Sequence, residues 1–243
     1  MAADQPCHLS VVIPVYNEEA RLGGTLTRIH EYLAAQSYKS EILVVDDGST
    51  DRTVEVAKSA GADSRLRLLC HEVNRGKGAA VRTGMAAARG QFALFSDADL
   101  STPIEEIEKL WPKLGAGFDI VIGSRGLRES QIVVHQNIVR ETMGRTFNLL
   151  VRLLVVPGIH DTQCGFKLFT RRAVDAVFPR CQLNGWAFDV ELLALALSEG
   201  LRIAEVPVRW INSPNTRVKA FSASKQMFFD LLRLRRRFKK KLF

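Results

Sequence analysis

Short runs of apolar residues alternate with longer mixed segments along the first half of the chain. Most of these runs lack a polar residue at every second position, which is typical of parallel strands buried on both faces. The predicted strands cover Leu9–Val15, Glu41–Val45, Leu66–Cys70, Phe92–Ser96 and Asp119–Ile122. The predicted helices between them cover Glu18–Gln36, Asp51–Ala60, Lys77–Ala88 and Ile104–Leu114. This alternation predicts an α/β fold with a mostly parallel, doubly wound sheet and helices on both faces.

The alternation stops after Arg125. Residues 126–136 are predicted to form a polar loop, residues 137–156 an amphipathic helix, and Cys164–Phe169 a further strand. The 243 residues are 47% apolar and 25% charged, which is ordinary for a globular protein, and they contain no low-complexity linker. We therefore expect one α/β domain over residues 1–216 and a short tail over residues 217–243.

Polar residues gather where the predicted strands end. In open α/β sheets, ligands bind beyond the carboxyl ends of the strands. The segments found there are Tyr16-Asn17-Glu18, Asp46-Asp47-Gly48-Ser49, Asn74-Arg75-Gly76-Lys77-Gly78, Asp97-Ala98-Asp99 and Gly123-Ser124-Arg125. Five strand ends that supply polar groups to one crevice indicate a binding site more strongly than any single motif does.

Asp97 and Asp99 flank one residue at the end of a predicted strand. Two carboxylates at such a turn can hold a hard divalent cation together with substrate phosphates, so we expect Mg²⁺ or Mn²⁺ there. A pair of this spacing also occurs in solvated loops by chance. Its position beside the other polar strand ends favours the metal site.

Two further segments have the chemistry of a nucleotide site. Asp46 or Asp47 could accept a hydrogen bond from a ribose hydroxyl or a base N–H, with helix capping as the alternative use of this segment. The segment Asn74–Gly78 resembles a phosphate loop, although it lacks the GxxxxGK[ST] pattern. Its glycines permit a ligand to approach the backbone closely. Arg75 and Lys77 would then face the nucleotide, or else be exposed basic residues at a helix start.

Together these segments resemble glycosyltransferase family 2 in order and in spacing. The matching segments are Val12–Glu18, Val44–Ser49, Asn74–Gly78, Asp97–Asp99 and Gly123–Arg125. The resemblance implies a GT-A fold, a nucleotide-diphosphate sugar donor and a divalent metal. Asp161–Phe169 and Trp186–Glu191 are similar to the polyprenyl-phosphate branch of the family, and in particular to its dolichyl-phosphate β-glucosyltransferases.

The resemblance also implies a role for individual residues. The residues that would hold the nucleotide sugar are Pro14, Tyr16, Glu18, Asp46, Asp47, Lys77 and Asp97. Asp99, together with Asp97, would bind the metal. Arg125 and Arg140 would meet phosphate groups of donor or acceptor. The acids that would line the reaction centre are Asp161, Asp189 and Glu191.

The resulting hypothesis is an inverting transfer of glucose from UDP-glucose to polyprenyl or dolichyl phosphate, giving a β-linked product. A phosphate monoester has a second pKa of ~6, so it is largely ionised near pH 7 and needs no strong base. The alternatives are another donor such as GDP-mannose, a soluble glycan acceptor, a sugar-1-phosphate nucleotidyltransferase, and a non-enzymatic binding module. The lack of a glycine-rich triphosphate loop after the first strand disfavours the nucleotidyltransferase, and intact Asp97 and Asp99 disfavour lost catalysis.

The positive charge of the chain is concentrated in the tail. Residues 217–243 hold ten Lys or Arg and one acid, a charge of +9, whereas the net charge of the whole chain is +8. Phe228, Leu231, Leu232 and Phe238 recur there at helical spacing. A basic amphipathic helix of this kind indicates an anionic membrane surface as partner. A helix docked on the core, or a tail that binds nucleic acid, is the alternative, and we expect no nucleic acid.

Nothing in the sequence suggests a segment that crosses a membrane. A span needs roughly 20 consecutive apolar residues, and polar residues interrupt the apolar stretch over residues 147–159. We expect no signal peptide, and the four cysteines are scattered without a CxxC pair, as in reduced cytosolic proteins. The sequence therefore predicts a cytoplasmic protein that is peripheral on the cytoplasmic face of a membrane.

Overall fold

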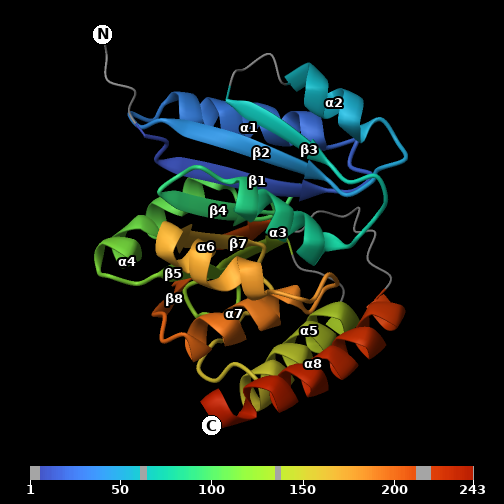
Figure 1. Cartoon of the computed structure of the whole chain (residues 1–243), viewed down its shortest axis with the longest axis vertical. Coiled ribbons are helices and arrows are strands. Elements are labelled where there is room, and N and C mark those ends of the chain that lie inside the picture. The colour runs from blue at the N-terminus through green and yellow to red at the C-terminus, as the bar shows by residue number, and fades with distance from the viewer. Residues whose placement is uncertain (1–5, 61–64, 135–137, 212–219, 243) are drawn as a thin grey trace.

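A computed structural model describes residues 6–60, 65–134, 138–211 and 220–242 of the chain. Its centre is a seven-stranded sheet with the order β3-β2-β1-β4-β7-β5-β8 (Figure 1). The strands are β1 (Leu9–Val15), β2 (Ser40–Asp46), β3 (Leu66–Cys70), β4 (Phe92–Ser96), β5 (Ile120–Ser124), β7 (Phe166–Thr170) and β8 (Ile203–Pro207). Six strands are parallel, and β7 is antiparallel to both of its neighbours, β4 and β5. The prediction of a mostly parallel α/β sheet is confirmed.

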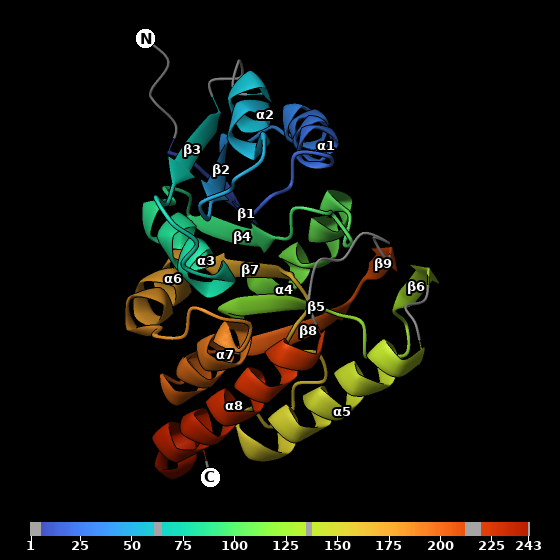
Figure 2. The ribbon, with the colours of Figure 1, turned by 90° about the vertical axis from the view of Figure 1, so that its right-hand side faces the viewer.

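Helices cover both faces of this sheet (Figures 1 and 2). The helices are α1 (Leu22–Ala34), α2 (Thr53–Ala60), α3 (Lys77–Ala87), α4 (Trp111–Gly115), α5 (Ile138–Leu154), α6 (Arg171–Val177), α7 (Phe188–Ser198) and α8 (Ala220–Leu242), with 3-10 turns η1 (Ile104–Lys109) and η2 (Phe178–Arg180). One face packs against α1, α2 and η1, and the other against α3, α6 and α7. A separate pair of short parallel strands joins β6 (Gln131–Val134) to β9 (Arg209–Ile211).

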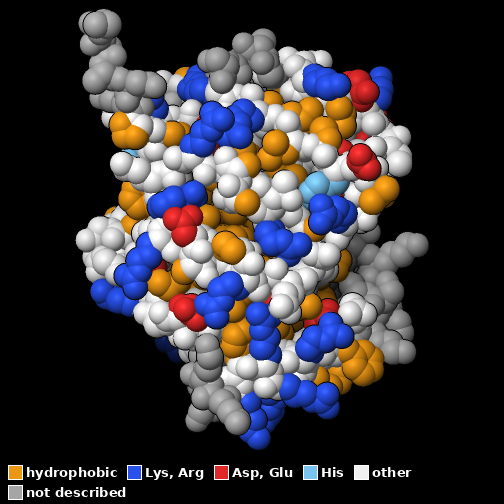
Figure 3. Space-filling model, in the orientation of Figure 1, with side chains coloured by type: hydrophobic (Ala, Val, Ile, Leu, Met, Phe, Trp, Pro, Cys, Tyr) orange, Lys and Arg blue, Asp and Glu red, His pale blue; other side chains and the backbone are white. Residues whose placement is uncertain are grey.

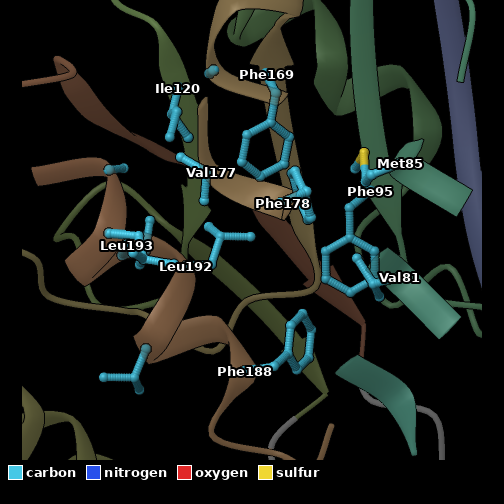
Figure 4. Packing of buried hydrophobic residues seen from close by; sticks show 14 of the residues in the cluster. Val81, Met85, Phe95, Ile120, Phe169, Val177, Phe178, Phe188, Leu192 and Leu193 are labelled. Carbon is cyan, nitrogen blue, oxygen red and sulfur yellow. The ribbon is translucent and has the colours of Figure 1, made fainter. Parts of the chain in front are cut away.

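The apolar runs form strands because each has a buried partner on both sides. Along β1, Val11 and Ile13 pack into the cluster under α1, while Val12 between them packs into the cluster under α3 and α7. Successive side chains of a strand point to opposite faces, so a continuous apolar run is what a doubly covered strand requires. Figure 4 shows the larger of the two clusters, where Phe95 of β4 meets Phe188 of α7.

Several boundaries differ from those predicted. Helix α1 begins at Leu22 rather than at Glu18, because the backbone N–H of Glu18 donates to the hydroxyl of Thr53 at the start of α2. Residues 131–134, predicted as loop, form strand β6, because β9 provides a pairing partner. The helix predicted over Ile104–Leu114 is a 3-10 turn followed by a short α-helix.

The basic segment at the end of the chain is a docked helix. In α8, Leu231, Leu234 and Phe238 are buried in the same cluster as α3 and α7. The predicted division into a domain over residues 1–216 and a tail over residues 217–243 stays a prediction, and residues 217–219 and 243 of that tail lie outside the described residues. The predicted apolar stripe is therefore largely used for packing, and contact with a membrane stays a prediction. None of the helices in the described ranges combines the length and the hydropathy that crossing a bilayer requires.

Candidate active site

The turn after β4 presents Asp97 and Asp99 at the carboxyl edge of the sheet. The backbone N–H of Asp97 donates to the Gly165 carbonyl at 3.0 Å, and Asp99 Oδ1 accepts from the Ser101 N–H at 3.0 Å. The Thr25 hydroxyl of α1 donates to the carbonyl of the intervening residue, Ala98, at 2.6 Å. The turn is therefore fixed from three sides, while both carboxylates remain half-buried and accessible.

Lys77 is the direct partner of Asp97. It is the first residue of α3, and its Nζ lies 2.6 Å from Asp97 Oδ1. The ammonium group also lies 5.3 Å from the ring centroids of both Phe95 and Trp186. Burial would lower the pKa of Lys77, but the carboxylates of Asp97 and Asp189 outweigh it and raise that pKa. Lys77 therefore keeps its positive charge beside the carboxylate pair.

Two arginines add to the positive charge near this turn. Arg21 is paired with Glu18 at the end of β1 and lies close enough to Asp97 and Asp99 to interact with them electrostatically. Arg125, at the end of β5, also interacts with Asp97. Carboxylates surrounded in this way are suited to a metal and to the phosphates that it bridges.

The carboxylate pair fits a metal that substrate phosphates help to hold. Within the described ranges, no group of three or more His, Cys, Asp or Glu could form a complete protein cage for an ion. Mg²⁺ usually keeps several waters and takes only one or two carboxylates plus substrate phosphates. Asp97 and Asp99 supply that number of ligands, so the residues present suit the expected Mg²⁺ or Mn²⁺.

The acids after β2 have different environments. Asp46 Oδ2 accepts from the Ser49 N–H at 3.0 Å, but Asp46 Oδ1 is buried without a hydrogen-bond partner among the described residues. Asp47 accepts from His71 Nδ1 at 2.7 Å and from the backbone N–H groups of Arg75 and Gly76 at 3.0 and 2.8 Å. Asp46 thus has a free acceptor for a ligand, whereas Asp47 orders the loop before α3.

The glycines of that loop make room for protein rather than for a ligand, contrary to the prediction. A Cβ on Gly76, which has φ +100°, would lie 2.4 Å from the Asn184 carbonyl oxygen. A Cβ on Gly78 would lie 2.6 Å from the Leu183 carbonyl oxygen, and the Gly78 N–H donates to the Asn184 carbonyl at 2.8 Å. The segment before α7 is therefore docked on the loop and brings Trp186 to Lys77.

The first strand carries the remaining predicted nucleotide contacts. Pro14 is buried within β1, and Tyr16, directly after the strand, is 43% exposed. Asn17 has a left-handed φ of 55°, and its side-chain oxygen accepts from the Thr50 N–H at 2.8 Å. These bonds join the ends of β1 and β2, so Tyr16 projects at the same edge as Asp46 and Asp97.

Arg125 and Asp161 form a bidentate ion pair. The Arg125 Nε and Nη2 atoms lie 2.6 and 2.9 Å from the two Asp161 oxygens, and the Arg125 backbone N–H donates to Asp161 at 3.0 Å. The guanidinium lies 5.6 Å from the ring centroid of Trp210. Asp161 is buried, while the Arg125 side chain remains 28% exposed. The pair leaves part of the guanidinium available to an anion.

Asp161 is held in its ionised form by Arg125, and its expected place at the reaction centre stays a prediction. Burial by itself would raise the pKa of Asp161, but the charge and hydrogen bonds of Arg125 lower it to about 2. Its oxygens are committed to Arg125 and to the Gln163 N–H, with Asn148 of α5 nearby at 3.5 Å. Asp161 therefore positions Arg125. The side chain of Arg140 lies outside the described residues.

Asp189 and Glu191 of α7 point to different surroundings. Asp189 Oδ1 accepts from the buried ammonium of Lys167 at 2.5 Å, close to Lys77 and Asp97. Glu191 is fully buried and lies 2.5 Å from Arg237 of α8, and it also accepts from two backbone N–H groups of the segment before α7. The carboxylate of Glu191 thus joins α7 to α8 and to the preceding segment, and its expected place at the reaction centre stays a prediction.

Three groups at this site were not singled out from the sequence. Arg21 lies in a segment without a recognisable motif, whereas Lys167 and Trp186 lie in segments that carry the family resemblance but had no role assigned to them. Trp186 is 40% exposed and stands over Lys77. An exposed tryptophan beside charged residues is a signal that could have been used, because large apolar side chains are costly to leave in water.

Comparison with known proteins agrees with the site geometry. The profile of glycosyl transferase family 2 matches residues 10–178. The chain belongs to glycosyltransferase family 2. It is therefore an enzyme, a hexosyltransferase of the GT-A type. Its relatives include dolichyl-phosphate beta-glucosyltransferases from Dictyostelium discoideum and Homo sapiens, each 39% identical over 95% of this chain and 75% of the relative. The one from Saccharomyces cerevisiae is 35% identical over 96% of this chain and 75% of the relative.

Solved structures support the same fold. Glucosyl-3-phosphoglycerate synthase from Mycobacterium tuberculosis aligns with a TM-score of 0.70 at 22% identity, over 94% of this chain and 80% of the other. Mannosyl-3-phosphoglycerate synthase from Rubrobacter xylanophilus aligns with a TM-score of 0.69 at 23% identity, over 97% and 76%. The GT-A fold expected from the sequence is confirmed.

Proposed function

We propose that this glycosyltransferase moves glucose from UDP-glucose onto dolichyl phosphate or another polyprenyl phosphate. The observation that carries the proposal is the partly exposed Arg125, held by Asp161, near the carboxylate turn of Asp97 and Asp99. In this proposal the turn would take a metal-bound diphosphate, and Arg125 would take a second phosphate. The names of the relatives, dolichyl-phosphate beta-glucosyltransferases, support the lipid phosphate and glucose.

On the donor side, the residues present suit a uridine diphosphate. Asp46 offers a buried, unpaired oxygen to a base N–H or a ribose hydroxyl, and Tyr16 lies exposed at the same edge. Asp97 and Asp99 would hold Mg²⁺ or Mn²⁺, which when bound neutralises charge on the diphosphate. The structure of the mycobacterial synthase with Mn²⁺ and UDP supports this choice of donor and metal.

On the acceptor side, Arg125 would hold the lipid phosphate. A phosphate oxygen attacks the anomeric carbon, the bond from that carbon to the diphosphate oxygen breaks, and UDP leaves with the electron pair. Attack opposite the leaving group inverts the anomeric centre, so an α-linked donor gives a β-linked product. The attacking monoester is ionised near pH 7. No base is needed, which agrees with the ionised, paired state of Asp161.

The acceptor defines where the enzyme works. Polyprenyl phosphates reside in membranes, and the relatives named above act on dolichyl phosphate. We propose that the protein is peripheral on the cytoplasmic face of a membrane, where nucleotide sugar and lipid phosphate meet. The four cysteines are without disulfide partners, as in a reducing compartment.

One transfer assay tests the proposal. Purified protein with Mg²⁺ is given radiolabelled UDP-glucose, UDP-galactose or GDP-mannose, and either polyprenyl phosphate, polyprenol or 3-phosphoglycerate. We expect label to enter the organic phase only with UDP-glucose and polyprenyl phosphate. Equal transfer to polyprenol would refute the ionised-phosphate argument. Transfer to 3-phosphoglycerate alone would show a soluble acceptor, and preference for GDP-mannose would replace the donor.

A further inference from the structure

Helices α5 and α8 lie side by side at the end of the molecule farthest from α1 and α2 (Figures 1 and 2). Their inner sides are part of the core, through Val151 of α5, with Val155 just after it, and through Leu231 and Leu234 of α8. Their outer sides face away from the body. The two outer sides together are called the α5–α8 surface below.

This surface carries an unusual share of exposed apolar side chains. Eight large hydrophobic residues among the described residues are exposed, and four of them lie on these two helices. Leu149 and Leu153, one turn apart on α5, are 45% and 62% exposed. Phe228 and Phe229 of α8 are 44% and 55% exposed. Apolar side chains left partly in water are less favourable than buried ones, and a cluster of them marks an interaction surface, so we expect an apolar partner here.

The same surface is cationic. Arg233, Arg235, Arg236 and Lys239 of α8 are exposed. Asp230, the one acid on this helix, is buried, accepts from Gln226 at 3.2 Å and lies 3.6 Å from Arg233, so it offsets one of these cations and leaves the other three. Figure 3 shows Lys and Arg side chains gathered along the lower edge of the molecule, over α8. Exposed rings and leucines next to arginines form the pattern of a helix that lies in a bilayer interface.

We propose that the α5–α8 surface docks on an anionic phospholipid bilayer, an inference that rests on the proposed lipid acceptor. Phe228, Phe229, Leu149 and Leu153 enter the boundary between headgroups and acyl chains, and the arginines meet lipid phosphates. Each cation near an anionic leaflet adds to the attraction. A second copy of the chain is a poorer occupant, because a symmetric contact would bring two cationic faces together.

The α5–α8 surface lies close to Arg125, the proposed site of the acceptor phosphate. Asn148, next to Leu149 in sequence, lies on the inner side of α5, where its Nδ2 is 3.5 Å from Asp161 Oδ1 and its Oδ1 accepts from the Thr162 hydroxyl at 3.1 Å. Asp161 in turn holds Arg125. An α-helix with its side chains is about 10–12 Å across. The anion site thus lies about one helix diameter from the bilayer, so a lipid phosphate reaches it with its chain still embedded.

Vesicle co-sedimentation tests the proposal on the full chain. Vesicles of phosphatidylcholine are compared with vesicles that contain phosphatidylserine. We expect wild type to bind the anionic vesicles, with binding that salt weakens only in part, since charge attraction is screened over ~8 Å and apolar insertion is not. The variant Leu149→Gln/Leu153→Gln/Phe228→Gln/Phe229→Gln should lose at least tenfold in partition. The matched control is Val73→Gln, which removes an apolar residue 66% exposed elsewhere and should bind as wild type does.

Light scattering and transfer assays distinguish bilayer docking from dimer formation and from misfolding of the variant. Undiminished vesicle binding by the quadruple variant would overturn the proposal. So would a wild-type dimer in light scattering that this variant dissociates, since a second copy would then cover the surface. Transfer to a short-chain, water-soluble acceptor phosphate should stay within threefold of wild type, which also shows that the variant is folded. Absent transfer by wild type with normal vesicle binding would refute the proposed function alone.

Discussion

Replacing Gly165 by alanine should displace Asp97 and leave the fold intact. Gly165 lies just before β7, and a Cβ at this position would stand 1.9 Å from Asp97 Oδ2, 2.2 Å from its Cγ and 2.5 Å from its Oδ1. Ordinary contacts of a Cβ begin at 3.4 Å, so the carboxylate must move by about 1.5 Å. The obstacle is a half-exposed side chain, which can rotate toward solvent without moving a strand.

The size of the effect follows from this displacement. A movement of that order breaks the 2.6 Å ion pair between Lys77 and Asp97 and takes one carboxylate away from the proposed metal. A misplacement of about 1 Å at a reacting centre can cost ~10²-fold in rate, equivalent to about 2.7 kcal/mol of activation free energy. We therefore expect kcat/KM for UDP-glucose to fall by roughly two orders of magnitude.

The assay pairs transfer kinetics with thermal unfolding. The control is Gly24→Ala on an exposed side of α1, where an added Cβ meets nothing within 4 Å. This change should keep full activity and, by raising helix propensity, stabilise the protein by about 0.5–1 kcal/mol. If Gly165→Ala keeps kcat/KM within threefold of wild type, then Asp97 need not occupy the position seen beside Lys77, and its assigned role is wrong.

Three further substitutions test the separate parts of the site. Asp99→Asn should abolish transfer while circular dichroism is unchanged, and near-normal activity of this variant in EDTA would exclude the metal role. Arg125→Lys should raise KM for the lipid phosphate more than KM for the donor, because an ammonium cannot form the bidentate pair with Asp161; equal kinetics would remove Arg125 from the acceptor site. Asp161→Asn should lower the free energy of unfolding by ~3–5 kcal/mol at pH 7. Because the pKa of Asp161 is lowered from 3.8 to about 2, this difference should persist above pH 4 and shrink between pH 4 and pH 2 in urea titrations.

The first half of the fold was predictable from the sequence because its signals are local. Three strands, β1, β3 and β4, begin and end at the predicted residues. Helix α7 was missed because Phe188 to Ala196 are all buried, so the segment lacks the apolar stripe by which a helix is recognised. Strand β7 was predicted, but its antiparallel insertion between β4 and β5 was not, since pairing order leaves no trace in a strand's own pattern.

The residues of the candidate site likewise divide into those that could be predicted from the sequence and those that could not. The carboxylates of Asp97 and Asp99 and the cation Lys77 could be placed at strand ends from the sequence alone. The partners of Asp161 and Glu191 could not, since Arg125 and Arg237 are 36 and 46 positions away along the chain. Sequence alone does not show which carboxylate is already engaged in an ion pair. That engagement distinguishes a structural carboxylate from one available to react.

The antiparallel strand β7 acts as a spacer between opposite charges. Neighbouring strands lie about 4.8 Å apart, so the interposed strand sets the ends of β4 and β5 roughly 10 Å apart. In an uninterrupted parallel sheet, Asp97 and Arg125 would be adjacent and could neutralise each other as a salt bridge. With β7 between them, Arg125 is paired with Asp161 instead. The strand order thus keeps the carboxylates of the β4 turn and the Arg125 guanidinium apart, a separation that the two proposed phosphate sites require.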